Sequence, residues 1–167
     1  MDDDEGFRQF VRDQWAPLVR TAYLLTGDRG TAEDLVQAAL EKTHRRWERI
    51  DTPSVYVRRA MVNTASSWWR RRRPLEVPLL ASDSPVRGDA FVQIEQRQQL
   101  LVALRRLPPR TQAVLVLRYF EDLSEADTAT VLGCSIGSVK SQASRGLARL
   151  RLDFADEAPA QLQEEPC

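Results

Sequence analysis

Basic residues gather in one stretch near the C-terminal end of the chain. Between Ile136 and Arg151 the sequence holds four cations, several small polar residues and no acidic residue. Lys and Arg bind phosphates, Gln and Ser hydrogen-bond to base edges, and small side chains let a helix enter the major groove of DNA. This interpretation selects Ser138, Lys140, Ser141, Gln142, Ser144, Arg145 and Arg149. A solvated basic helix of an ordinary bundle is the alternative.

A second stretch interleaves aromatic rings with arginines, and it reads VNTASSWWRRRR at residues 62–73. Cations hold phosphates and flat rings stack on unpaired bases, so this pattern is typical of contact with melted nucleic acid. Alternatively, Trp68 and Trp69 both belong to the core, and the arginines only solvate the end of a helix. The candidate residues are Tyr56, Arg58, Arg59, Asn63, Ser66, Ser67, Arg70, Arg71, Arg72 and Arg73.

Turn-forming and capping residues before the basic stretch predict two short helices with a tight turn between them. Ser124 and Ser135 can cap the two helices through their hydroxyls, and Gly133 suits the left-handed residue that ends the first. The first helix is expected to turn an apolar side inward and a polar side outward, the latter with Asp127, Thr128 and Thr130. The apolar stripe of the second is Val139, Ala143, Leu147 and Leu150. The pattern is that of a helix-turn-helix.

Helical periodicity also predicts three elements upstream, at residues 7–26, 31–47 and 54–72. We expect the first helix to break or kink at Pro17, because proline lacks the N–H that an interior helical position donates. Thr31 is the expected N-cap of the second helix, with Asp34 three residues on as in a capping box.

The chain is predicted to be all-α, because strand signals are absent. Further helices are expected at residues 91–107 and 110–120. The predicted organisation is two small helical domains, residues 1–73 and 91–152, joined by a flexible, proline-bearing linker at residues 74–90. An acidic tail at residues 153–167 follows, and we expect it to be frayed or disordered.

Composition excludes several classes of protein. The chain has 24 basic and 24 acidic residues, but their segregation still creates strong local fields. With a single histidine, His44, and with Cys134 and Cys167 far apart, we expect free thiols, no metal site and no cofactor. The sequence offers no nucleophile–base arrangement and no glycine-rich phosphate loop, so an enzyme is not expected. No apolar run suits membrane insertion, and we expect a soluble cytoplasmic protein.

Four motifs follow one another in a distinctive order: AEDLVQAALEKTHRRW at 32–47, VNTASSWWRRRR at 62–73, LPPRTQAVLVLRYFEDLS at 107–124 and LGCSIGSVKSQASRGLARLR at 132–151. Over residues 7–152 the chain resembles the bacterial extracytoplasmic-function (ECF) sigma factors, small two-domain members of the sigma-70 family. With its tryptophan pair directly before the arginines, the chain resembles the actinobacterial SigE-like subgroup. The resemblance implies a subunit that binds core RNA polymerase and directs promoter-specific initiation, while polymerase supplies the chemistry.

The resemblance also implies partner surfaces. Residues 32–47 would bind the basic clamp helices of the polymerase β′ subunit through a complementary polar face, made of Glu33, Asp34, Gln37 and Glu41. Leu35, Val36 and Leu40 of the same helix would be core. The C-terminal domain would meet the β flap, and an anti-sigma factor is a further partner to consider.

For promoter DNA, the resemblance implies two contacts. Residues 54–73 would open the minus-ten element, with Asn63 beside a flipped base and the arginines on phosphates. The loop 50–53 matches the family's specificity loop, but it holds Ile50 where an aromatic would identify the captured base. Residues 124–151 would read the minus-thirty-five element, and Gln142 stands where many members have Arg.

A helix-turn-helix regulator of duplex DNA, independent of polymerase, is the alternative function. It accounts for residues 107–151 but leaves the arginine-rich helix at 62–73 without a role.

Overall fold

The computed structural model describes the backbone of residues 3–71 and 89–156, in which every regular element is helical. The elements are α1 (Asp3–Thr26), α2 (Arg29–His44), the 3-10 helix η1 (Trp47–Arg49), α3 (Pro53–Arg71), α4 (Asp89–Arg106), α5 (Pro109–Leu115), the π-helical turn η2 (Val116–Phe120), α6 (Glu125–Leu132) and α7 (Ile136–Asp156). The all-α prediction is confirmed. Most of the expected linker and of the acidic tail lie outside the described residues, as do Arg72 and Arg73.

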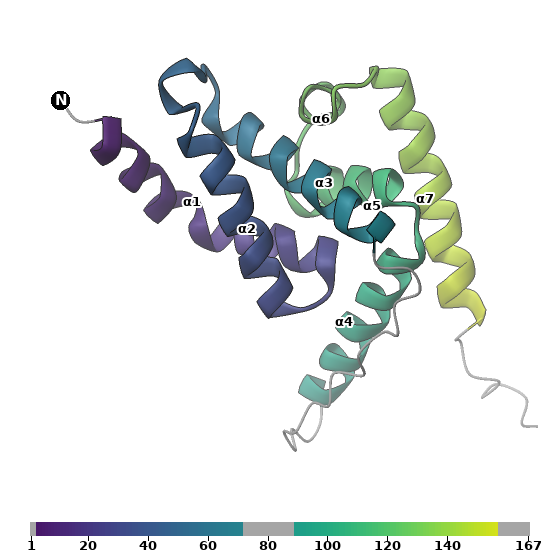
Figure 1. The fold of residues 1–167 in the computed structure, drawn as a ribbon. Coiled ribbons are helices and arrows are strands. Elements are labelled where there is room, and N and C mark those ends of the chain that lie inside the picture. The colour runs from purple at the N-terminus through teal and green to yellow at the C-terminus, as the bar shows by residue number, and fades with distance from the viewer. Residues whose placement is uncertain (1–2, 72–88, 157–167) are drawn as a thin grey trace, which may run out of the picture.

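The N-terminal half, α1–α3, packs around one apolar core (Figure 1). Leu18, Leu35, Val57 and Met61 are fully buried there. Trp68 packs against this core from α3, while Trp69 is half-buried. Of the tryptophan pair, Trp68 therefore packs directly against the core.

Of the break or kink expected at Pro17, the break is wrong, because α1 runs unbroken from Asp3 to Thr26. An interior proline costs a helix about 3 kcal/mol. Residues on both sides of Pro17 contribute to the same core, Phe10 and Val11 before it and Leu18 and Ala22 after it. Burial of this continuous apolar stripe offsets the local cost.

Both predicted ends of α2 need correction. Its N-cap is Asp28, not Thr31: the carboxylate accepts from the backbone N–H of Gly30 at 3.1 Å and of Thr31 at 3.2 Å. Hydrogen bonds from Thr31, chiefly that of its side chain, lower the pKa of Asp28 below its ordinary value, although partial desolvation opposes them. The helix ends at His44, because Trp47 turns away into η1 and its ring packs 5.2 Å from that of Phe7.

The helix-turn-helix prediction is confirmed by its caps. Ser124 Oγ accepts from the N–H of Asp127 at 3.0 Å, Gly133 is left-handed with φ of 64°, and Ser135 Oγ accepts from the N–H of Ser138 at 3.1 Å. One residue of the expected polar side is misassigned, since Thr128 is fully buried. The second helix, α7, continues to Asp156, so the first four residues of the expected tail are helical.

The C-terminal half, α4–α7, has its own core and lies directly against the N-terminal half (Figure 1). Gln112 of α5 donates from Nε2 to the backbone oxygens of Leu24 at 3.0 Å and Leu25 at 3.3 Å. Gly27 has φ of 85°, and a Cβ there would lie 2.7 Å from Cδ of Arg105 in α4. The prediction of two linked domains did not anticipate this close contact.

We predict that Gly146→Ala destabilises the C-terminal half. Its Cβ would lie 2.8 Å from Cδ1 of Leu115 and 2.8 Å from Cγ2 of Thr111, where α7 crosses α5. Overpacking of this kind lowers the free energy of unfolding by about 1–3 kcal/mol, which urea denaturation can measure.

Gly137→Ala is the matched control in the same helix, because the nearest atom to its added Cβ would be Ser135 Oγ at 3.9 Å. There the gain in helix propensity should raise stability by about 0.5–1 kcal/mol. Equal stabilities of the two variants would show that α7 and α5 tolerate a wider separation.

Candidate nucleic-acid interface

The first turns of α7 present a polar face without an acidic side chain. Lys140, Ser144 and Arg145 are exposed on it. The Arg145 guanidinium donates to Ser141 Oγ at 2.5 Å, and Gln142 Nε2 donates to Ser138 Oγ at 3.0 Å. Successive turns thus align the predicted DNA-contacting side chains along one helix.

Two of the predicted cations on α7 have acidic neighbours. Lys140 Nζ lies 3.6 Å from Glu125 of α6, and Arg149 Nε lies 3.5 Å from Asp153. Both cations remain more than half exposed, so these pairs contribute little stability and compete only weakly with phosphates.

The exposed side of α3 carries the second group of predicted residues. Asn63, Arg70 and Arg71 are exposed, and Ser66 and Ser67 are half-buried. Helical spacing puts Asn63, Ser67 and Arg70 along one side of the helix. Neighbouring Thr64 is buried instead, and its hydroxyl accepts from Lys42 Nζ at 2.9 Å.

A pocket of about 540 Å³ opens where the loop 50–53 meets the start of α3. Its lining residues are Arg46, Arg49, Ile50, Asp51, Thr52, Val55, Tyr56 and Arg59. Sequence reasoning selected Tyr56 and Arg59 but missed Arg46 and Arg49, although arginines directly before the loop were a usable signal. The combination of a ring, guanidinium groups and polar loop atoms suits an unstacked base with its phosphate.

Arg58 and Arg59 are engaged within the protein. Arg58 pairs with Glu121, which directly follows η2, and only 16% of its side chain is exposed. Arg59 donates from Nε to the carbonyl oxygen of Val131 at 3.0 Å, and its other guanidinium nitrogen donates to that of Thr130. Nothing in the sequence pattern singled out Glu121.

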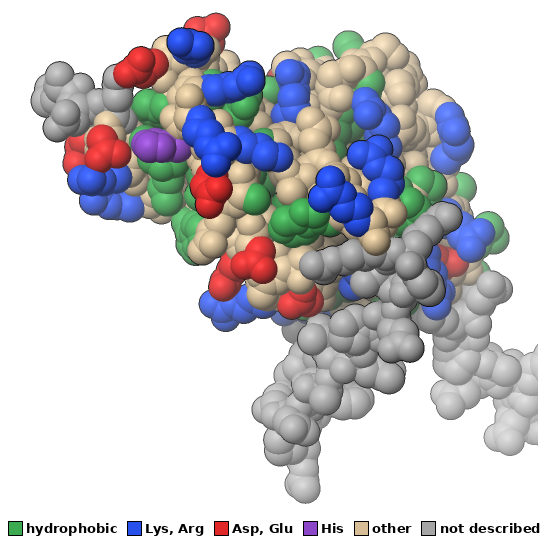
Figure 2. Space-filling model, viewed as in Figure 1, with side chains coloured by type: hydrophobic (Ala, Val, Ile, Leu, Met, Phe, Trp, Pro, Cys, Tyr) green, Lys and Arg blue, Asp and Glu red, His purple; other side chains and the backbone are tan. Residues whose placement is uncertain are grey.

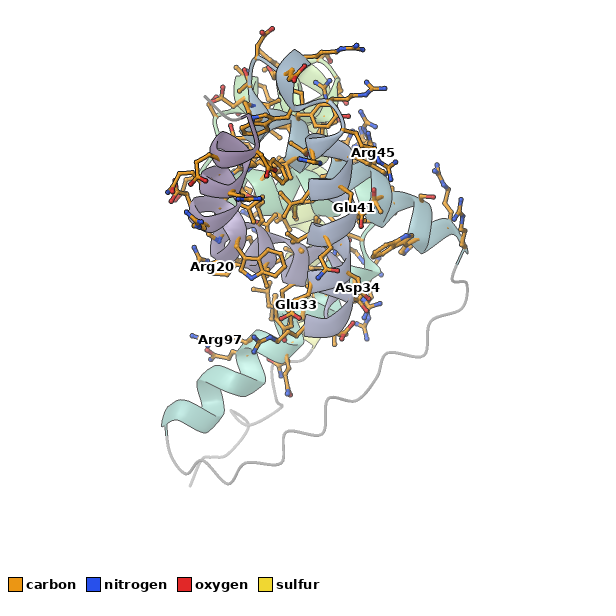
Figure 3. The ribbon with its side chains drawn as sticks, turned by 60° about the vertical axis from the view of Figure 1, so that its left-hand side comes forward. Arg20, Glu33, Asp34, Glu41, Arg45 and Arg97 are labelled. Carbon is orange, nitrogen blue, oxygen red and sulfur yellow. The ribbon has the colours of Figure 1, made fainter. Side chains whose placement is uncertain are left out.

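The acidic side chains predicted on α2 point in two different directions (Figure 3). Asp34 and Glu41 point outward from the same side of the helix, where Glu41 lies 3.9 Å from Arg45. Glu33 points instead toward α4 and pairs with Arg29 at 2.9 Å. Gln37 is exposed.

Glu33 forms part of an apolar groove of about 840 Å³ between the two halves. Its apolar walls are Trp15, Ala16, Val19, Tyr23, Leu24, Leu100, Leu101 and Phe120. Arg20 and Arg97 lie near Glu33 on its rim (Figure 3).

Charge is unevenly distributed over the face seen in Figure 2. Lys and Arg side chains gather over the end of α2, over α3 and beside α7, whereas Asp and Glu side chains lie mainly over α1 and the remainder of α2. Within the described part of the chain, no group of His, Cys, Asp and Glu is arranged to hold a metal ion. Among the helices of residues 3–71 and 89–156, none is long and apolar enough to cross a membrane.

Two family models match the chain. The model for Sigma-70 region 2 matches residues 11–74, and the model for Sigma-70, region 4 matches residues 97–150. These matches cover the α3 surface, the pocket and the helix-turn-helix, and they define the class of protein as a sigma factor of the sigma-70 type.

Full-length relatives agree with this assignment. The chain is 41% identical over 148 residues to the RNA polymerase sigma-E factor of Streptomyces coelicolor, covering 87% of this chain and 84% of that protein. It is 33% identical over 151 residues to the ECF RNA polymerase sigma factor SigM of Mycobacterium tuberculosis, covering 89% and 76%. The chain therefore belongs to the ECF sigma factors of the sigma-70 family, and its function is promoter-directed transcription initiation. The resemblance inferred from the sequence is confirmed. The alternative function, a helix-turn-helix regulator independent of polymerase, is not supported.

Solved structures support the fold. The sigma factor RpoE from Bartonella quintana, solved in complex with the anti-sigma factor NepR, superposes with a TM-score of 0.71 at 23% identity, over 90% of this chain and 98% of that chain. CnrH, solved with the cytosolic domain of CnrY, superposes with a TM-score of 0.68 at 19% identity, over 93% and 91%.

Proposed function

We propose that this sigma factor holds promoter DNA at two points, with residues 91–152 reading the minus-thirty-five element and residues 1–73 opening the minus-ten element. The proposal rests on the exposed face of α7, which has no acidic side chain and is held in place by the caps of Ser124 and Ser135. A helix of this kind enters the major groove with its N-terminal residues on base edges. Lys140 and Arg145 would make the longest-reaching contacts.

We propose that α3 and its adjoining pocket hold the melted strand. Opening a base pair requires a protein surface that holds the unstacked base in place of its neighbours in the duplex. Exposed Asn63 can pair with a base edge, and the pocket beside Tyr56 offers a ring for stacking. Arg46 and Arg49 would neutralise the accompanying phosphates.

The two proposed DNA contacts can be tested separately in run-off transcription with core RNA polymerase. Arg145→Ala should weaken promoter binding by about 1–3 kcal/mol if the guanidinium is bidentate to guanine, and it should relax preference within the minus-thirty-five element. Asn63→Ala should leave closed-complex binding intact but slow strand opening, which permanganate footprinting detects. Each variant controls for the other, and the same defect in both would contradict the division of roles.

We propose that core polymerase binds α2 on the side of Asp34 and Glu41, with Gln37 between them. Outward carboxylates complement a basic surface such as that of the β′ clamp helices. Glu33 is unlike them, because it points toward α4 and is paired with Arg29. The C-terminal half would contact the β flap, and the protein would act in the cytoplasm, at the nucleoid when bound to polymerase, with no catalytic residue of its own.

Reversing the charges of Asp34 and Glu41 together to Arg should weaken binding to core polymerase by about tenfold or more, chiefly through slower association at low salt. Surface plasmon resonance with immobilised core enzyme measures this change. Asp13→Arg, at an exposed acid on α1, is the control and should bind normally. Glu33→Gln should also bind normally. A loss of affinity as large as that of the double variant would show that Glu33 belongs to the contact surface.

We propose that an anti-sigma partner, if the chain has one, seats an amphipathic helix in the groove between the halves. The apolar walls suit such a helix, and Arg20 and Arg97 on the rim favour acidic flanks. In co-purification from the native host, Val19→Glu should release this partner while run-off transcription persists. Retention of the inhibitor by the Val19→Glu chain would exclude the groove.

A further inference from the structure

The side chains on the exposed face of α7 hydrogen-bond to one another in a fixed direction. Gln142 donates from Nε2 to Ser138 Oγ at 3.0 Å, and the Arg145 guanidinium donates to Ser141 Oγ at 2.5 Å. A hydroxyl that accepts from one neighbour keeps its own hydrogen for another partner. Neither serine hydroxyl donates to any group in the part of the chain that the structure describes. Both hydroxyls therefore have a hydrogen to donate to a ligand.

Gln142 directs its amide oxygen into the protein. Its Oε1 is buried and accepts no hydrogen bond from the described residues, whereas its Nε2 reaches Ser138. The reverse orientation of the amide would bury unpaired N–H groups in place of a carbonyl oxygen, and unpaired buried N–H groups are the rarer of the two in proteins. Gln142 therefore offers no acceptor to DNA from this position.

The cations of the same face add further donors. The side chains of Lys140 and Arg145 carry donors and no acceptor, and both are exposed. The carboxylate of Glu125 in α6 approaches this face, but it lies 3.6 Å from Lys140 Nζ, which partly neutralises it. Exposed Ser144 has no partner among the described residues, so its hydroxyl can still donate or accept. The first turns of α7 thus present mainly hydrogen-bond donors.

In the major groove, guanine and thymine present carbonyl oxygens, whereas adenine and cytosine present amino groups. We infer that α7 selects keto bases, guanine or thymine, on the DNA strand that it contacts, because its own side chains hold Ser138 and Ser141 as hydrogen-bond donors. The inference rests on the proposed reading of the minus-thirty-five element by this helix. Gln142 is then a positioning residue that acts through Ser138, and it does not itself contact DNA.

Adenine is commonly read by Asn or Gln, whose amide accepts from N6 and donates to N7. Gln142 is the one amide side chain between Ile136 and Arg151, and its oxygen is turned inward. The amino group of adenine or cytosine would therefore face donors and stay unpaired, which weakens binding to the wrong base. At its own base pair Arg145 narrows the choice to guanine, because N7 and O6 of guanine both accept from one guanidinium.

Every base pair holds one keto and one amino base, so the inference predicts which strand carries each. Replacing G·C by T·A keeps a carbonyl oxygen opposite the donor, whereas inverting either pair presents an amino group to it. With holoenzyme reconstituted from core RNA polymerase, inversion of the pair that faces Ser138 should weaken promoter binding about fivefold, and the G·C to T·A exchange should change it much less. Fluorescence anisotropy measures this on promoter duplexes that carry every possible base pair at each position of the minus-thirty-five element.

Variants of the serine and of its neighbour identify the pair and separate positioning from contact. Ser138→Ala should abolish the preference at one base pair, which locates it. Gln142→Met keeps the length of the side chain but leaves Ser138 able to accept, so the preference at that same pair should fall from about fivefold to about twofold or less. The preference at the base pair read by Arg145 should persist in both variants. Ser144→Ala is the matched control, and it should leave the pair that faces Ser138 unchanged.

The double variant decides the role of Gln142. In the Ser138→Ala background, Gln142→Met should add no further change in base preference, because residues that act as one unit are not additive. A further change there would show that Gln142 contacts DNA directly and would overturn its positioning role. A parent holoenzyme that prefers adenine or cytosine at the pair located by Ser138→Ala would overturn the selection of keto bases, and so would a Ser138→Ala variant without effect at any pair.

Failure of the proposed function gives a different result. In that case the parent holoenzyme shows no base preference at any position of the minus-thirty-five element, and Arg145→Ala changes none. The base-pair series on the parent protein needs no substitution, so a variant that folds poorly does not decide it. Circular dichroism of each variant, with helicity equal to that of the parent, shows that a changed preference comes from the hydrogen bonds of α7.

Discussion

The buried ion pair between Arg58 and Glu121 determines how the two halves of this sigma factor lie against each other. Removing one partner of such a pair is costly, because the other charge stays desolvated without compensation. Thr21 occupies the remaining oxygen of Glu121, and Gln112 and Arg59 add hydrogen bonds from neighbouring positions. These contacts are polar and directional, so they favour one arrangement of the two halves.

Each half has an apolar core of its own, one centred on Leu18 and Met61 and the other on Leu104 and Leu115. Hydrophobic burial is non-directional, and it stabilises each half through contacts of its own. The proposed surfaces for DNA and polymerase lie on exposed helix faces outside these cores.

Local signals predicted the helix-turn-helix well because its determinants are local: two serine caps and one left-handed glycine act within a few residues of chain. The predicted break at Pro17 failed because a core assembled from distant residues outweighed a local cost. Thr31 and Asp28 were both suitable caps by type, and the path of the chain entering α2 selected Asp28. Thr128 was expected to be polar and outward, yet α6 turns it inward against its neighbours.

The helical class, the two motif-bearing regions and the family follow from the amino-acid sequence alone, because periodicity, capping and residue type depend on near neighbours. Which predicted side chains are exposed to a partner depends on the tertiary structure. It turned Glu33 away from Asp34 and Glu41, brought Arg46 and Arg49 to a pocket with Tyr56, and joined Arg58 to Glu121. The last two residues are 63 positions apart in the chain, and no local pattern encodes a contact between groups that only the docking of two cores brings together.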